Sequence, residues 1–322
     1  MQRETFVRVY ARIVAIGVFV LLVAGALVTS TESGLAVPDW PLSYGRVMPP
    51  MVGGILFEHG HRLIAAALST LVGIQVAVLW WGEPRRSVRR LGLLAFAAIL
   101  AQALLGGLTV LLQLPPVVSS AHAALAQIVF ALVCTVAWKT SKVGSRTPQS
   151  ADGSGLDLAL RRTSLATGAI YLQIVLGAVM RHTGAGLAIP DFPLAFGGLA
   201  PTGAEFGLPG VAIHFSHRLG ALLVAVLVVR AASALARVEE SSPSERLRST
   251  WIALLLIQIV LGAFSIYTRK MPALTVAHLA TGALCFVTGV LIVLYLAEAR
   301  LAARLSVAPA EPVRAFEQQV PA

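Results

Sequence analysis

Four histidines form two pairs with equal spacing along the chain. His61 and His122 are 61 residues apart, and His217 and His278 are again 61 residues apart. Each lies in the first turn or two of an apolar block, and imidazoles on two facing helices can supply both axial ligands of a haem iron. Zinc and copper also bind imidazole, but no third ligand of a suitable type recurs at both places. The pattern favours haem; the alternative is four unrelated interfacial histidines bonded to backbone carbonyls.

An internal repeat accounts for the equal spacing. The segment GLAVPDWPL at 34–42 recurs as GLAIPDFPL at 186–194, at an offset of 152 residues. The offset is 156 for the histidines and for the pairs Gln102 and Gln258, Gly106 and Gly262. Because each repeat unit holds an even number of expected helices, both units insert the same way up, which predicts a parallel repeat about an axis along the membrane normal. The two units should then present equivalent sites at the same depth.

The two repeat units differ just before the first histidine of each pair. Glu58 precedes His61 at the position where His214 precedes His217. A carboxylate one helical turn before an iron ligand shares a helix face with it, and burial there would let it move protons during an oxidation. The alternative is a carboxylate at a helix N-terminus that only interacts with the helix dipole. We interpret the remaining histidines as non-ligands: His182 and His214 line the second site, and His59 is interfacial.

Arginines and a proline-containing loop complete each candidate site. Arg62 and Arg218 directly follow a candidate ligand, so they could pair with haem propionates; the alternative is an arginine that extends from a helix end to water. In both units the PDWP or PDFP motif lies in a long loop outside the membrane. Its aromatic residue, Trp40 or Phe192, is expected either over a cofactor edge or as the anchor of a structural lid.

The chain has the composition of an integral membrane protein. It holds 322 residues, of which 57% are apolar and 12% charged, against roughly 25% charged residues in a soluble domain. Apolar blocks of about twenty residues predict membrane-spanning helices. We predict an all-α integral membrane protein whose eight transmembrane helices form two four-helix bundles, at 10–30, 58–81, 91–112, 119–139, 163–181, 212–235, 250–268 and 273–297.

The distribution of basic residues predicts the orientation in the membrane. The formal net charge is +10, and nineteen of the 25 Lys and Arg residues fall on the side that holds both termini. The positive-inside rule therefore places both termini in the cytoplasm and the candidate sites near the outer face of the plasma membrane. Since the charge reflects topology, nucleic acid is excluded as a partner, and membrane lipid is expected around the helices.

The expected organisation is two halves joined by a linker. Residues 1–139 form the N-terminal half, 140–162 a polar cytoplasmic linker and 163–305 the C-terminal half, while the tail 306–322 is expected to be disordered. Cys134 and Cys285 each lie inside an apolar block without a CxxC or CxxCH spacing. The sequence therefore supports neither a cysteine zinc site nor covalent c-type haem attachment.

At these positions the chain resembles the haem A synthase family, membrane enzymes that oxidise haem O to haem A for cytochrome oxidase. The resemblance covers nearly all eight expected helices. It rests on Glu58-x-x-His61-Arg62, His122, His217-Arg218, His278 and the SGL-x-x-x-DWPL loop at 33–42 with its partner at 186–194. Many members carry a cysteine pair in the first outer loop, where this chain has Ala36 and Ser43, so it resembles a type that lacks the pair.

The resemblance implies a role for each half. His217 and His278 would hold a haem b cofactor, whereas His61 and His122 would bind the haem O substrate and Glu58 would act in catalysis. The C8 methyl of haem O would be oxidised to a formyl group by successive hydroxylations. Haem O and haem A are then the expected small-molecule partners. Contacts with haem O synthase or oxidase assembly factors, and a homo-oligomer, are left open.

Two other functions compete with this interpretation. A di-haem b electron-transfer cytochrome would also use two histidine pairs, although a pure carrier could keep Glu58 and His214 equivalent. A transporter built from parallel repeats is disfavoured because the polar residues cluster near the outer face instead of the midplane. The pigments bound to the protein would separate the first two functions, and solute uptake would test the third.

Overall fold

A computed structural model describes residues 2–142, 153–238 and 242–307 of the chain. These residues are mainly helical and form no strand, only the isolated bridges Ser43–Arg46 and Ala195–Gly198. Eight helices are long and apolar enough to cross a membrane, which confirms the predicted all-α class with eight spans. They are α1 (Gln2–Ser30), α2 (Gly54–Gly82), α3 (Arg86–Leu111), α4 (Pro116–Lys139), α5 (Gly153–His182), α7 (Val211–Leu235), α8 (Ser242–Tyr267) and α9 (Pro272–Val307).

Several helices extend beyond their predicted apolar spans. In particular, α5 begins at Gly153, so residues 153–162 of the predicted linker are helical, and α9 continues to Val307. Hydropathy marks only the apolar part of a helix, whereas the backbone continues where charged side chains find partners. Arg300 of α9 donates to Asp157 of α5 at 3.0 Å, in this extended part. Linker residues 143–152 and tail residues 308–322 lie outside the described residues.

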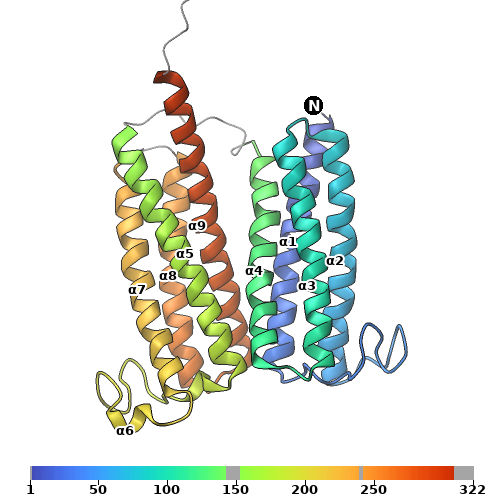
Figure 1. Ribbon diagram of the computed structural model, residues 1–322, viewed down its shortest axis with the longest axis vertical. Helices are drawn as coiled ribbons and strands as arrows, with labels where there is room; N and C mark the ends of the chain where they lie inside the picture. The colour runs from blue at the N-terminus through green and yellow to red at the C-terminus, as the bar shows by residue number, and fades with distance from the viewer. Residues whose placement is uncertain (1, 143–152, 239–241, 308–322) are drawn as a thin grey trace, which may run out of the picture.

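The helices gather into two groups of four that stand side by side (Figure 1). We call residues 2–139, with α1 to α4, the first half, and residues 153–307, with α5 to α9, the second half. Helices α4 and α5 pack together between the halves, and α9 packs against both α1 and α4. The beginning of α1 and the end of α9 lie at the same end of the molecule (Figure 1).

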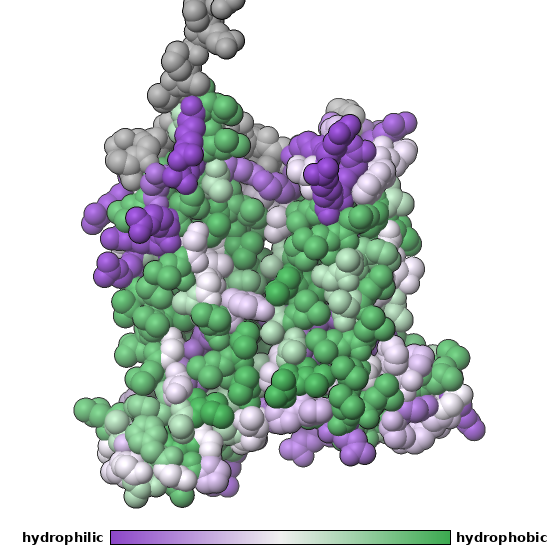
Figure 2. Space-filling model, in the orientation of Figure 1, coloured by the Kyte–Doolittle hydropathy of each residue, from purple (hydrophilic) through white to green (hydrophobic). Residues whose placement is uncertain are grey.

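The surface has the pattern expected of a multi-pass membrane protein. Figure 2 shows hydrophilic residues gathered at the two ends and an apolar band over the helices between them. Large side chains in this band are exposed; Leu104 of α3 and Leu222 of α7 are each 65% exposed. Such exposure of leucine is costly in water and favourable in lipid. The face of the membrane to which each end belongs remains a prediction.

Two long connections lie at the end opposite the termini (Figure 1). The first, residues 31–53, joins α1 to α2; the second, residues 183–210, joins α5 to α7 and contains the short helices η1 (Ala185–Leu187) and α6 (Gly203–Phe206). Each contains one cis X-Pro peptide, at Trp40-Pro41 and Phe192-Pro193. Each also turns through positive φ angles at two adjacent residues, Tyr44-Gly45 and Phe196-Gly197. The sequence repeat is therefore also a repeat of loop conformation.

Candidate functional site

An aspartate closes the turn in each long loop. The Asp39 carboxylate accepts hydrogen bonds from the backbone amides of Tyr44, at 2.7 Å, and Gly45, at 2.8 Å. Asp191 does the same for the amides of Phe196 and Gly197, both at 2.8 Å. The Gly45 and Tyr44 amides hold the pKa of Asp39 below its ordinary value, because they stabilise the charged form. The amides of Gly197 and Phe196 lower the pKa of Asp191 in the same way.

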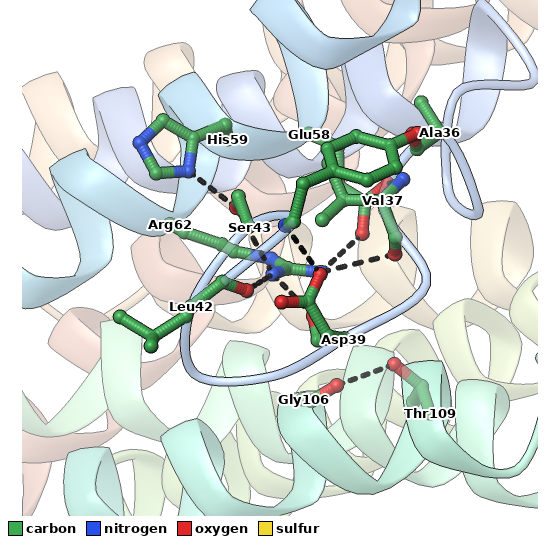
Figure 3. A network of polar contacts seen from close by, with 11 residues as sticks. Ala36, Val37, Asp39, Leu42, Ser43, Glu58, His59, Arg62, Gly106 and Thr109 are labelled. Carbon is green, nitrogen blue, oxygen red and sulfur yellow. Dashed lines mark hydrogen bonds and ion pairs between the residues drawn. The ribbon is translucent and has the colours of Figure 1, made fainter. Parts of the chain in front are cut away.

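Each loop is fastened to the helix that follows it by an arginine. Arg62 of α2 donates to the carbonyl oxygens of Asp39, at 2.7 Å, and Leu42, at 2.8 Å (Figure 3). Arg218 of α7 donates to the carbonyls of Asp191, at 2.6 Å, and Leu194, at 2.7 Å. From the sequence, haem propionates or water are the expected partners of these guanidinium groups. The backbone contacts show that both arginines position loops; pairing with propionates stays a prediction.

Glu58 is buried beneath the first loop. Its carboxylate accepts from the backbone amide of Val37 at 2.8 Å and forms an ion pair with Arg62 at 2.5 Å (Figure 3). Only 4% of Glu58 is exposed. The charged carboxylate is thus compensated by a cation and an amide donor, as a buried charge requires. His214 makes the corresponding contact in the second half, accepting from the amide of Ile189 at 3.2 Å.

A buried polar pair lies beside Glu58 only in the first half. The Ser43 hydroxyl and His59 Nδ1 are 2.7 Å apart, and Arg62 also donates to the same hydroxyl at 3.4 Å. The corresponding residues in the second half are Ala195 and Phe215, which have no polar side-chain atoms. From the sequence, His59 was expected to be interfacial, and its contact with Ser43 was not predicted. The replacement of Ser43 by Ala195 and of His59 by Phe215 in the second repeat could have indicated the pair.

The four paired histidines lie against glycines of a neighbouring helix. A Cβ placed on any of these glycines would meet the Cε1 atom of the imidazole, closer than carbon atoms normally approach. Glycine therefore gives each ring the room to lie between two helices. The contacts are Gly25 of α1 with His61 at 3.0 Å, Gly106 of α3 with His122 at 2.8 Å, Gly177 of α5 with His217 at 2.9 Å, and Gly262 of α8 with His278 at 3.1 Å.

The members of each predicted pair lie within electrostatic range of one another. This holds for His61 and His122 in the first half and for His217 and His278 in the second. His182, at the end of α5, also lies within electrostatic range of His122. The sequence predicts His182 at the second site; because α5 packs on α7 and α9 of the second half as well as on α4 of the first, this stays a prediction. Iron binding by the four paired histidines stays a prediction.

Glutamines hold three of the four histidines. Gln102 of α3 donates to the carbonyl oxygen of His122 at 2.9 Å, and His278 Nδ1 lies 3.1 Å from the carbonyl oxygen of Gln258 in α8. Gln173 of α5 lies 3.0 Å from His217 Nδ1 and donates to the His217 carbonyl at 2.7 Å. Sequence analysis paired the first two glutamines through the repeat but missed Gln173, since its counterpart at the offset of 152 is Leu21.

The two histidine pairs differ in the hydrogen bonding of their Nδ1 atoms. In the first half, the Nδ1 atoms of His61 and His122 are buried and have no hydrogen-bond partner among the described residues. In the second half, Nδ1 of His217 and of His278 each has a partner. Buried imidazole nitrogens without partners are costly and suit a site that receives a ligand. The first pair thus fits a site that receives a haem, and the second pair, whose Nδ1 atoms have partners that orient the rings, fits a site that holds one.

Other metal chemistry finds less support in the described ranges. They contain no group of three or more His, Cys, Asp or Glu side chains that could hold a metal ion. Cys134 and Cys285 are both free.

A comparison with models of protein families assigns this chain to a family. Residues 52–290 match the model of COX15-CtaA, described as a cytochrome oxidase assembly protein. The chain belongs to the COX15-CtaA family. The match begins just before α2 and ends within α9, so it includes all four paired histidines, Glu58 and both loop arginines.

Curated relatives of this COX15-CtaA member are named Heme A synthase. The chain is 35% identical over 247 residues to that of Symbiobacterium thermophilum, covering 74% of this chain and 78% of the relative. It is 28% identical over 300 residues to that of Lysinibacillus sphaericus, covering 89% and 95%. It is also 28% identical over 288 residues to that of Bacillus cereus, covering 86% and 88%.

Proposed function

We propose that this protein is a haem A synthase, an oxidoreductase that converts the C8 methyl group of haem O into a formyl group. The observation that carries the proposal is membership of COX15-CtaA together with relatives named Heme A synthase that match over most of the chain. The two histidine pairs between helices supply the local chemistry, since imidazole is a haem ligand. Haem O and haem A are then the substrate and the product.

We assign the resident haem b to His217 and His278 and the substrate haem to His61 and His122. The support is the difference in hydrogen bonding at Nδ1. Partners at Gln173 and Gln258 orient the second pair, and such outer contacts hold metal-ligating histidines in place. The Nδ1 atoms of the first pair have no such partner among the described residues. Gln102 contacts His122 at Nε2, so the His61 ring is the freer of the two to adjust, as a site that exchanges substrate for product requires.

Glu58 is the proposed proton acceptor of the first site. Haem iron, when bound, supplies the oxidising chemistry. Oxidation of a methyl group removes hydrogen from carbon, and the protons need an acceptor near the reacting group. Glu58 precedes His61 by one turn and shares its helix face. Its ion pair with Arg62 compensates the negative charge when the carboxylate is deprotonated.

The first loop is proposed to cover the substrate site. Trp40 lies directly against Gly107 of α3, where a Cβ would overlap the indole, so the loop extends from α2 across to α3. Arg62 holds its backbone at Asp39 and Leu42. A fastened cover excludes water, which limits side reactions of an oxidised intermediate. The loop would lie on the outer face of the plasma membrane, with both termini in the cytoplasm.

A di-haem electron-transfer cytochrome is the second candidate. The occurrence of two similar histidine pairs favours it. However, Glu58, His59 and Ser43 are replaced in the second half by His214, Phe215 and Ala195. A polar cluster confined to one half suits a reaction that occurs in one half.

Chromatography of extracted haems separates the two functions. The full chain is produced in cells that make haem O but lack their own haem A synthase, and the haems of purified protein and membranes are resolved. We expect haem A in the membranes and haem b with haem O or haem A on the protein. The double variant His61→Ala/His122→Ala is the matched control and should yield no haem A. Haem b alone, without haem A in the membranes, would support the electron carrier and contradict the synthase.

A further inference from the structure

Arg181 connects the two halves at the loop end of the helices. It lies one residue before the end of α5, in the second half, and donates to Ser30 Oγ of α1 at 2.6 Å and to the carbonyl oxygen of Ala26 at 3.2 Å. Both acceptors belong to the first half. The side chain therefore turns back toward a neighbouring helix instead of extending to water beyond the end of its own helix.

The positive charge of Arg181 has no anionic partner in the described part of the chain. The ion pairs recorded there involve Arg62, Arg85, Lys139 and Arg300. A hydroxyl and a carbonyl leave most of the five guanidinium donors unused. A half-buried guanidinium among apolar helices is costly without a counter-ion. The arrangement therefore calls for an anion that comes from outside the protein chain.

Both candidate sites lie close to this cation. Arg181 lies one helical turn after Gly177 of α5, against which the His217 ring of the second pair lies. On the other side, its acceptor Ala26 directly follows Gly25, against which the His61 ring lies. Arg181 thus lies next to elements of both histidine pairs, and its own helix lies against a ring of the second pair.

The repeat places this cation in only one half. At the offset of 152 residues, which also relates Gly25 to Gly177, the counterpart of Arg181 is Thr29. The Thr29 hydroxyl donates a hydrogen bond to the carbonyl oxygen of Gly25 at 3.3 Å. Arg218, the other arginine of the second site, already donates to the loop carbonyls of Asp191 and Leu194. Both bonds of Arg181 come from Nη2, which leaves Nη1 and Nε for an anion, whereas both Nη atoms of Arg218 are bonded to the loop.

We propose that Arg181 binds a propionate carboxylate of the haem held by His217 and His278, and that its charge favours the reduced form of that haem. This inference rests on the proposed function. Guanidinium groups bind carboxylates through two parallel hydrogen bonds, and each haem carries two propionates. A cation beside the macrocycle stabilises the added electron, so it raises the reduction potential. Arg181 is a positioning residue with an electrostatic effect.

A potentiometric titration of the purified full-length protein, followed by haem absorbance, tests this role. In Arg181→Gln, the ratio of reduced to oxidised haem b at a fixed ambient potential should fall on the order of tenfold. Arg181→Lys keeps the charge and should restore most of the ratio. Ser30→Ala keeps the guanidinium and removes one acceptor, so its effect should be smaller than that of Arg181→Gln. Arg269→Gln removes one charge from an exposed position after α8 and is the matched control.

The outcomes separate the inference from the proposed function. Wild-type protein without bound haem would contradict both. Wild-type protein with haem b, together with an unchanged potential in folded Arg181→Gln, would overturn the inference alone. A purely structural tie between α1 and α5 would lower thermal stability in Arg181→Gln and Ser30→Ala alike without moving the potential. Equal shifts in Arg181→Gln and Arg269→Gln would also overturn it, because the effect would then be general.

Discussion

Glu58 of α2 and His214 of α7 hold the same position of the loop in their respective halves. Glu58 accepts from the amide of Val37 at 2.8 Å, and His214 accepts from the amide of Ile189 at 3.2 Å. Val37 and Ile189 correspond in the repeat. Holding the loop therefore does not require a carboxylate. The carboxylate of Glu58 must therefore have a role that is specific to the first half.

Substitutions of Glu58 should separate loop anchoring from chemistry. Glu58→Gln and Glu58→His each keep an acceptor for the Val37 amide but cannot act as the anionic base. We expect both to bind haem normally and to form haem A about 100-fold more slowly or worse. Glu58→Ala loses the anchor as well, so it should also loosen the loop. The measurement is the time course of haem A in membranes supplied with haem O. A normal rate in Glu58→Gln would show that the carboxylate only anchors.

Substitutions of the paired histidines should remove one haem each. His61→Ala and His122→Ala should lose bound haem O or haem A but keep haem b, whereas His217→Ala and His278→Ala should lose haem b. Absorbance spectra and chromatography of the extracted pigment measure both. His59→Phe introduces the residue of the second half and should keep both haems. Retention of both haems in all four alanine variants would exclude axial ligation by these imidazoles.

Substitution of a glycine that lies against a paired histidine should weaken the binding of one haem only, as substitution of that histidine should. An alanine Cβ at Gly106 would lie 2.8 Å from the His122 ring, which forces the ring off its rotamer and should weaken substrate haem binding about tenfold. Gly262→Ala should instead weaken haem b, through His278. Gly168→Ala of α5 is the control, because nothing lies within 4 Å of its Cβ position. Haem titration of the apoprotein measures each affinity; equal losses in all three variants would contradict selectivity.

The Asp39 turn should open in acid. The amides of Gly45 and Tyr44 lower the pKa of Asp39 in the folded loop. The contribution is therefore fully present above the unfolded value, about 3.9, and is lost as the pH falls through the lower folded value. Asp39→Asn should show a loosened loop at neutral pH and no further change in acid.

Tryptophan fluorescence can follow this opening, since Trp40 lies on Gly107 when the loop is closed. The wild-type signal should change only below about pH 4. Trp40→Phe, which introduces the residue of the second half, should abolish that change. A transition centred above pH 5 would show that another group controls the loop.

The eight spans were predictable because they depend on local pattern: a run of about twenty apolar residues spans a bilayer whatever its neighbours. The pairing of His61 with His122 and of His217 with His278 rests on their equal spacing in the repeat, and its role in haem binding stays a prediction. The long contacts were not predictable in this way. Arg62 reaches loop carbonyls about twenty residues away, and Arg181 reaches a helix of the other half. Such contacts depend on how helices are placed in space.

Helix ends were the least predictable part of the fold. Sequence analysis treated 153–162 as linker because it is polar, but α5 already runs through it. Arg300 of α9 compensates the charge of Asp157 in this segment, and hydropathy does not register such a partner. Gln173 was missed for a different reason, since its counterpart Leu21 is apolar and the repeat gave no match.

The packing of α9 has a consequence for biogenesis. This helix contacts α1, α4, α5 and α8, an ion pair joins its Glu298 to Lys139 at the end of α4, and it carries His278. The ribosome synthesises α9 after the other seven spans described above. All the helices that carry or contact the first histidine pair are therefore synthesised before α9, which the second pair requires. Under the proposed assignment, the substrate haem site is synthesised before the haem b site.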